Sequence, residues 1–193
     1  AYELCRRNNG EKRCEYVFDI KMTIIKSKKF VVRPFKRGDE ESLIRNINDK
    51  EIYKRTLRIP FPYKLKYAKE WVKGCISSAK KRQKNSVNFA ITINEEVIGG
   101  IGFNQIQQHK AEIGYWLAKQ YWNKGIMTEA ARLATKFRFD NLKLRRVSAY
   151  VFLKNNASAR VLEKNGYRKE GLLSKYHFKD GKYIDAVLYA KVK

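Results

Sequence analysis

A polar, glycine-containing segment, KQYWNKG at residues 119–125, lies between a strand-like pattern and a helical pattern that begins near Ile126. A turn that opens a helix presents unpaired backbone N–H groups and the positive end of the helix dipole to an anion. Asn123 and Gly125 suit such a turn because both tolerate a positive φ, and Lys124 adds charge. We therefore predict a pyrophosphate site here, with an ordinary strand-to-helix connection as the alternative.

The elements around this segment follow from the periodicity of the apolar residues. Before it, apolar side chains alternate in three runs, which predicts a central antiparallel meander over 87–93, 97–106 and 113–117. The first two strands are joined by the turn-forming sequence Asn94-Glu95-Glu96. After the segment, apolar residues at helical spacing predict a helix: Ile126, Ala130, Leu133, Ala134 and Phe137.

The outer elements complete the expected fold. Residues 30–35 indicate a short strand ended by Pro34, and Asp39 is placed to cap a helix with acidic residues in its first turn. A longer amphipathic helix, with Trp71 on its apolar face, is expected at about 65–84. The fold class is therefore α+β, a single domain whose mixed sheet is interrupted by helices. The C-terminal elements expected are a strand at 147–151, a short helix closed by Asn165-Gly166, and strands at 167–178 and 183–192 joined at Asp180-Gly181.

The composition bounds the class of protein. The 193 residues include 44% hydrophobic side chains, enough for one sizeable core, and only 3 Pro, which excludes a proline-rich chain. No apolar run approaches the roughly 20 residues that cross a bilayer, so the cytoplasm is the expected compartment. Cys5, Cys14 and Cys75 lack metal-type spacing, and reduced thiols with no metal are expected. Residues 1–21 are expected to be an N-terminal extension, either an upstream segment or a partner-contacting arm, before a domain over 22–193.

Charge is the unusual feature of the composition. The 43 Lys and Arg residues exceed the 19 Asp and Glu residues and give a formal net charge of +24. Such a field attracts nucleic acid, acidic proteins and anionic small molecules. The excess is spread along the chain without a clustered motif, so a lysine-rich surface that keeps the protein soluble is the alternative, and direct nucleic-acid contact stays open.

Three motifs occur in one order along the chain. Residues 112–117 (EIGYWL) precede residues 120–130 (QYWNKGIMTEA), which precede residues 155–158 (NNAS) with 162–167 (LEKNGY). This set resembles the GNAT superfamily of acetyl-CoA-dependent N-acetyltransferases, and within it the ribosomal-protein-alanine N-acetyltransferase branch. The resemblance runs from about Ile24 to the C-terminus, and it implies a mostly antiparallel mixed sheet, flanked by helices and splayed at its central strands.

The resemblance also implies how acetyl-CoA is bound. The pyrophosphate is expected on the loop that opens the helix, and the pantetheine arm beside the preceding strand, where backbone groups freed at a bulge polarise the acetyl carbonyl. Asn123 replaces the first glycine usual in the loop, so its Cβ is expected to crowd the phosphate. The residues implied in cofactor binding are Trp116, Leu117, Ala118, Gln120, Asn123, Lys124, Gly125, Ile126, Met127 and Asn156.

The reaction needs a base for the proton of the attacking amine and a donor for the departing thiolate. Family members often use a carboxylate where Glu112 lies, and His177 is the second candidate because imidazole titrates near neutral pH. The tyrosine that many members use as the acid falls on Leu162 here, so the resemblance points to Ser158 as the donor. The alternatives are a strand-end charge paired with Lys110 or solvent for Glu112, an exposed strand residue for His177 and a helix-capping role for Ser158.

The implied function is transfer of acetyl from acetyl-CoA to a primary amine, first of all the N-terminal α-amino group of a protein. The positive charge favours an acidic ribosomal protein or the ribosome over cationic polyamines and aminoglycosides. Acetylation of those small amines is one alternative, because Asp39, Glu40, Glu41 and Asp49 are available to line an acceptor pocket. A non-catalytic CoA- or RNA-binding domain is another. A homodimer across the terminal strands is compatible with the sequence, and no membrane partner is expected.

Overall fold

The computed structural model describes residues 2–8, 11–17, 24–80, 85–107, 109–142 and 144–193. The strands are β1 (Tyr2–Asn8), β2 (Glu11–Val17), β3 (Ile25–Lys26), β4 (Val31–Pro34), β5 (Val87–Ile93), β6 (Glu96–Gln107), β7 (Lys110–Leu117), β8 (Arg146–Phe152), β9 (Arg168–Lys179) and β10 (Lys182–Val192). The helices are α1 (Glu40–Ile47), α2 (Lys50–Arg55), α3 (Leu65–Lys80), α4 (Ile126–Leu142) and α5 (Asn156–Lys164), with a 3-10 turn at Lys119–Tyr121.

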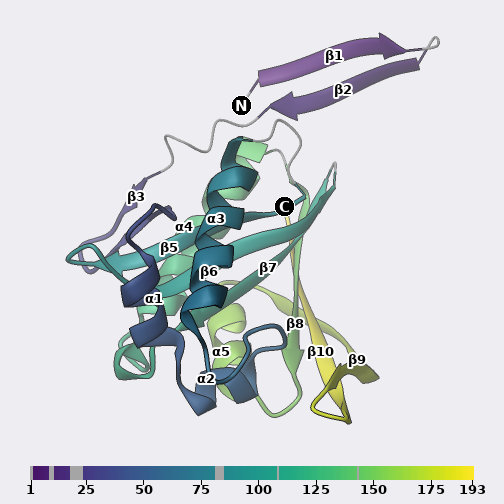
Figure 1. Ribbon diagram of the computed structural model, residues 1–193. Helices are drawn as coiled ribbons and strands as arrows, with labels where there is room; N and C mark the ends of the chain where they lie inside the picture. The colour runs from purple at the N-terminus through teal and green to yellow at the C-terminus, as the bar shows by residue number, and fades with distance from the viewer. Residues whose placement is uncertain (1, 9–10, 18–23, 81–84, 108, 143) are drawn as a thin grey trace.

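One eight-stranded sheet forms the body of the protein, in the order β3-β4-β5-β6-β7-β8-β10-β9 (Figure 1). Every neighbouring pair is antiparallel except β7 and β8, which are parallel and are joined through α4. This mixed, mostly antiparallel sheet with flanking helices confirms the predicted α+β class. Strands β1 and β2 pair with each other in a second sheet. The rest of the predicted extension, residues 1, 9–10 and 18–21, lies outside the described residues.

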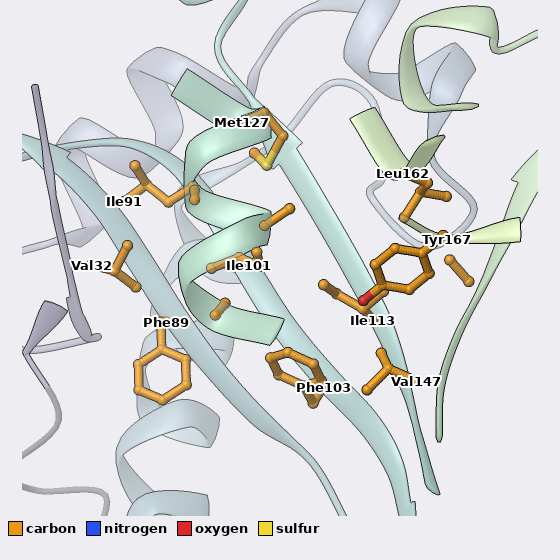
Figure 2. Packing of buried hydrophobic residues seen from close by; sticks show 14 of the residues in the cluster. Val32, Phe89, Ile91, Ile101, Phe103, Ile113, Met127, Val147, Leu162 and Tyr167 are labelled. Atoms are coloured by element: carbon orange, nitrogen blue, oxygen red, sulfur yellow. The ribbon is translucent and has the colours of Figure 1, made fainter. Parts of the chain in front are cut away.

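The sheet carries a hydrophobic core on each face, as the alternation of side chains along a strand requires. On β5, Phe89 and Ile91 belong to the core that includes α4 and α5, whereas Ala90 between them belongs to the core that includes α1 and α3. Figure 2 shows the first core, where Phe103 of β6 and Ile113 of β7 lie beside α4. One face of the central strands therefore packs against α4 and α5, and the other packs against α1 and α3.

Helix α3 confirms the predicted amphipathic helix over the described residues. It extends to Lys80, and residues 81–84 of the prediction lie outside the described residues. Its buried side chains include Ala68 and Val72, whereas Trp71, which was predicted on the apolar face, is 41% exposed. The rest of the predicted stripe packs against the core, including Tyr67, Cys75 and Ile76, whereas Trp71 lies at its exposed edge and packs edge-on against Phe35. Within the described ranges, no helix is both long and apolar enough to cross a membrane.

Asp39 precedes α1 as predicted, but its side chain does not cap the helix. Its carboxylate accepts hydrogen bonds from both terminal nitrogens of Arg33, at 2.9 and 2.8 Å, and from the Lys36 amide at 2.9 Å. Both Arg33 and Asp39 are buried, so the carboxylate is held by a bidentate guanidinium instead of by helix amides. The capping prediction was wrong for α1. Asp49, by contrast, caps α2 through its side chain.

Strand β7 separates from β8 after three paired residues, which confirms the predicted splay. Residues Glu112 to Leu117 remain paired with β6. The expected bulge lies on β6 and not on the splaying strand: the register shifts between Asn104 and Gln107, where Gln105 has a φ of 48°. Beyond Glu112, the backbone groups of β7 that face β8 therefore lack a strand partner on that side. The residues paired between β7 and β8 are Lys110 with Arg146, Ala111 with Val147, and Glu112 with Ser148.

Candidate active site

A cleft of about 1480 Å³ lies where β7 and β8 separate. Its lining includes both strands, the loop before α4, the start of α5, residues 55–60 and part of β9. Segments that are far apart in the sequence therefore meet around the point where the sheet is open. The residues predicted from the sequence that line this cleft are Glu112, Trp116, Leu117, Asn123, Gly125, Ile126, Met127, Ser158 and His177.

Three residues of the predicted cofactor loop do not line the cleft with their neighbours. Ala118 is buried in the protein, and its amide bonds back to β6. The Gln120 side chain donates a hydrogen bond to Asn46 Oδ1 at 3.2 Å, which ties the loop to α1. Lys124 is exposed, with its Nζ 5.6 Å from the centre of the Tyr121 ring. These side chains hold or flank the loop instead of facing the cleft.

The loop before α4 has the backbone expected of an anion site. Asn123 has a φ of 59° and Gly125 a φ of 75°, so both residues adopt the left-handed conformation that the sequence predicted. Helix α4 then begins at Ile126 and runs for 17 residues. The first backbone amides of an α-helix have no carbonyl partner within the helix. Asn123, Gly125 and Ile126 all line the cleft. The helix start is therefore available to a phosphate group that enters the cleft.

Two basic side chains on α5 also line the cleft and were missed in the sequence analysis. Arg160 and Lys164 are four residues apart, so they project from the same side of the helix. Helices α4 and α5 contact each other, which brings these charges to the cleft beside the α4 start. The four-residue spacing was visible in the sequence, but the packing of α5 next to the loop was not.

The two faces of β7 present different chemistry. Glu112, Gly114 and Trp116 alternate with Ile113, Tyr115 and Leu117 along the strand. Trp116 packs with the core of α1 and α3, whereas Tyr115 packs with the core of α4 and α5. The carboxylate of Glu112 and the phenol of Tyr115 therefore belong to opposite faces of one strand, and both residues line the cleft.

Ser158 is held in place by two other residues. The Tyr115 hydroxyl lies 2.9 Å from Ser158 Oγ and 3.1 Å from the Ser158 carbonyl oxygen. The Ser158 amide donates to Asn155 Oδ1 at 3.3 Å, so Asn155 caps α5. Asn155 lines the cleft, whereas the predicted Asn156 is exposed and does not. Tyr115 was missed in the sequence analysis, because no local pattern links two residues that are 43 positions apart.

Glu112 is a half-buried carboxylate at the edge of the splay. Burial raises its pKa above the usual value, and the nearby Arg58 guanidinium partly opposes this shift. Among the described residues, no salt bridge involves Glu112, so the alternative pairing with Lys110 is not observed. A carboxylate with a raised pKa and no cation bound to it is suited to accept a proton.

His177 lies among aromatic rings on the wall formed by β8 and β9. Its ring centre is 4.7 Å from that of Tyr176, 5.5 Å from that of Phe152 and 6.5 Å from that of Tyr150. Burial lowers the pKa of His177, and Arg58 lowers it further. The lowered pKa favours the neutral imidazole, which is the form that can accept a proton. The alternative of a fully exposed strand residue does not apply, because the side chain is half-buried.

One of the backbone groups expected to be free for the cofactor is engaged within the protein. Trp122 Nε1 donates a hydrogen bond to the Leu117 carbonyl oxygen at 2.7 Å. The Ala118 amide donates to the Ile98 carbonyl oxygen at 2.8 Å. The prediction of free groups near Leu117 is therefore wrong for its carbonyl oxygen, because the loop itself supplies a donor.

The charged lining of the cleft is mostly positive. Its acidic side chains are Glu70 and Glu112, and its basic side chains are Arg55, Arg58, Arg160 and Lys164. The four acidic residues considered for an amine pocket, Asp39, Glu40, Glu41 and Asp49, do not line it. In the part of the chain that the structure describes, no group of three or more His, Cys, Asp or Glu side chains is placed to hold a metal ion.

Comparisons with known proteins agree with this geometry. The profile of the family described as Acetyltransferase (GNAT) domain matches residues 29–168. The uncharacterized N-acetyltransferase p20 of Bacillus licheniformis is 29% identical over 174 residues, which cover 89% of this chain and 97% of that protein. The ribosomal-protein-serine acetyltransferase of Escherichia coli K12 is 34% identical over 106 residues, which cover 54% of this chain and 59% of that protein.

Similarity in three dimensions extends over most of the chain. The structure of Mycobacterium smegmatis RimJ in complex with CoA-disulfide has a TM-score of 0.75 and is 25% identical, covering 84% of this chain and 81% of that one. The family profile spans β4, the central meander, the loop before α4 and most of the cleft lining. The chain therefore belongs to the GNAT family and is an N-acetyltransferase.

Proposed function

We propose that the protein transfers the acetyl group of acetyl-CoA to the N-terminal α-amino group of an acidic protein, such as a ribosomal protein. The observation that carries the choice of acceptor is the formal net charge of +24, together with the Arg58 guanidinium, unpaired within the described residues, which lines the cleft with Glu112 and His177. The residues of this lining also divide into a set suited to the cofactor and a set suited to the amine.

The residues present fit acetyl-CoA as a cosubstrate. The α4 start, with Asn123 and Gly125 in left-handed conformations, offers amides and a positive helix end to the pyrophosphate. Arg160 and Lys164 add cations for the remaining phosphate charge. The gap between β7 and β8 then leaves room for an extended arm, beside backbone groups of Tyr115 and Trp116 that have no strand partner on the β8 side. The complex of RimJ with a CoA derivative supports this assignment by similarity.

The chemistry follows from the two faces of β7. A neutral amine attacks the carbonyl carbon of the thioester, a C–N bond forms and the C–S bond breaks. Glu112 accepts the proton of the amine, and His177 is the alternative acceptor. On the other face, the Ser158 hydroxyl donates a hydrogen bond to the departing thiolate, which then takes a proton from solvent. The base and the thiolate donor are kept apart, because Glu112 lies on one face of β7 and Ser158 bonds Tyr115 on the other face.

The acceptor is a protein N-terminus and not a polyamine. A polyamine carries several positive charges and would be repelled by the net charge of +24 and, in the cleft, by the unpaired Arg58 guanidinium. An α-amino group carries a single charge, loses it more readily than a side-chain amine, and can belong to a chain that is acidic elsewhere. The name of the Escherichia coli relative, a ribosomal-protein-serine acetyltransferase, also supports a protein acceptor.

The test compares two acceptors at the same acetyl-CoA concentration. An acidic peptide with a free N-terminus is assayed against spermidine by CoA thiol release, and mass spectrometry locates the acetyl group. We expect kcat/KM for the peptide to exceed that for spermidine by about tenfold or more, with the acetyl group on the α-nitrogen. The same peptide with a formylated N-terminus and an internal lysine is the control and is expected to stay unmodified. Faster acetylation of spermidine would establish the small-amine alternative instead.

A further inference from the structure

Residues 56–63, which connect α2 to α3, are anchored near both ends. The Lys179 ammonium, on the same strand as His177, donates hydrogen bonds to the Thr56 carbonyl oxygen at 2.7 Å and to the Tyr53 carbonyl oxygen. At the other end, the Tyr63 amide donates to Asn48 Oδ1 at 2.9 Å. Lys179 also lies 3.6 Å from the centre of the Tyr53 ring. The segment is therefore held against the cleft by β9 and by the end of α1.

Arg58 projects from this anchored segment and has no partner of its own. Its side chain lines the cleft, and Arg58 is exposed. In the described ranges, no hydrogen bond or salt bridge of Arg58 occurs, in contrast to Arg55, which pairs with Glu51 at 3.1 Å. Its charge acts on both Glu112 and His177, which come from two other elements. An unpaired guanidinium thus lines the same cleft as the two candidate bases.

A cation at this position has two consequences for an amine acceptor. It disfavours a bound ammonium and so helps to present the amine in the neutral form that attacks. It also weakens the binding of any acceptor that brings only positive charge. Both effects favour an acceptor that carries a negative group close to its amine, because that group would neutralise the cation. The planar guanidinium matches a carboxylate with two parallel hydrogen bonds.

We propose that Arg58 forms a carboxylate-binding subsite, so that the protein selects acceptors with a carboxylate close to the reacting amine. This inference rests on the proposed acetyl transfer to an α-amino group. Two sources share this chemistry: the side chain of an acidic second or third residue of a protein N-terminus, and the α-carboxylate of a free amino acid. The first source agrees with the proposed protein acceptor. The experiment separates the two.

The test uses conjugates that bind without turnover, so it does not depend on catalysis. CoA sulfur is joined through an acetyl linker to the α-nitrogen of Ser-Asp-Ala-amide or of Ser-Asn-Ala-amide, which differ only in the charge of the second residue. A second pair joins the same linker to glycine or to glycinamide. Dissociation constants are measured by calorimetry at 150 mM salt for the original protein, Arg58→Gln and Arg132→Gln.

Arg132→Gln is the matched control. Arg132 is exposed on α4, does not line the cleft, and its replacement lowers the net charge by the same amount. We expect the Asp conjugate to bind about fivefold more tightly than the Asn conjugate to the original protein and to Arg132→Gln. With Arg58→Gln the ratio is expected to fall to about one, since the guanidinium is absent.

The outcomes separate the subsite from the proposed function. Equal binding of all carboxylate and amide conjugates to the original protein would overturn the subsite, and so would a preference that Arg58→Gln leaves intact. An Arg58-dependent preference in the glycine pair alone would retain the subsite and assign it to free amino acids, which would overturn the protein acceptor. A preference in the peptide pair supports both. The spermidine comparison, which uses turnover, tests the proposed function separately.

Discussion

The Tyr115 hydroxyl lies 2.9 Å from Ser158 Oγ, across the gap between β7 and the first turn of α5. Tyr115 is held by the core under α4 and α5, so it fixes the position of the serine hydroxyl at the cleft. Burial raises the pKa of Tyr115, which therefore stays a neutral phenol through the physiological range and keeps its proton to share with Ser158.

Tyr115→Phe is expected to lower kcat by about three- to tenfold while leaving the Kd for CoA unchanged, because it removes one hydrogen bond to Ser158. Ser158→Ala is expected to lower kcat further, and the double variant to match Ser158→Ala alone. Steady-state kinetics and calorimetry measure these effects. Tyr167→Phe is the control, because the Tyr167 hydroxyl bonds Thr135 at 2.8 Å in the same core and does not line the cleft. Additive losses in the double variant would show that Tyr115 does not act through Ser158.

Replacement of the candidate bases is expected to separate their roles. Glu112→Gln should lower kcat by about 100-fold, since the amide cannot accept the proton of the amine, whereas His177→Asn should cost less than about tenfold. Both variants are assayed with saturating acetyl-CoA. The reverse order would assign the proton transfer to His177.

The pH dependence gives an independent measure of the base. Activity falls on the acid side as the pH drops through the pKa of the base, because the protonated group cannot accept a proton. Arg58 lowers the pKa of Glu112 and that of His177, so Arg58→Gln is expected to move the acid limb of kcat/KM to higher pH. Arg132→Gln should leave the limb in place. An unchanged limb in Arg58→Gln would show that neither group controls it.

The glycines of β6 permit the close approach of β7. A Cβ at Gly99 would lie 2.8 Å from the Trp116 carbonyl oxygen and 2.9 Å from Leu117 Cδ1, so β7 itself would have to move. We expect Gly99→Ala to lower the free energy of unfolding by about 1–3 kcal/mol in urea denaturation. Gly171→Ala on β9 meets nothing within 4 Å and is expected to change stability by less than about 0.5 kcal/mol. Equal stability of the two variants would contradict the proposed tight packing.

Asn123 lies in the proposed cofactor loop, where the resemblance implies a glycine, and its φ of 59° is one that glycine adopts without strain. Asn123→Gly removes a Cβ at the proposed phosphate site, and we expect it to tighten CoA binding by about two- to fivefold. Asn123→Ala keeps a Cβ in the same conformation and is expected to weaken binding. Calorimetric titration with CoA checks both, with a plain polyphosphate as a control for the charge of +24. Weaker binding by Asn123→Gly would show that the Asn123 side chain contributes contacts of its own.

Local signals in the sequence determined most of the fold and the backbone of the turn before α4. Alternation gave the central strands, and the residue types at 123 and 125 set the left-handed turn before α4, because these preferences act over a few residues. Two of the three motifs contain Glu112 and Ser158, and His177 was predicted separately from its titration range; all three line one cleft.

Tertiary structure alone decided the contacts between distant segments. Tyr115 reaches Ser158 only because the start of α5 lies beside β7, and Arg58 lines the same cleft as Glu112 while β9 and α1 anchor its segment. The Asp39 side chain likewise forms a buried ion pair with Arg33 and does not cap α1. No periodicity encodes such contacts, because they depend on how elements pack and on which polar groups are buried together.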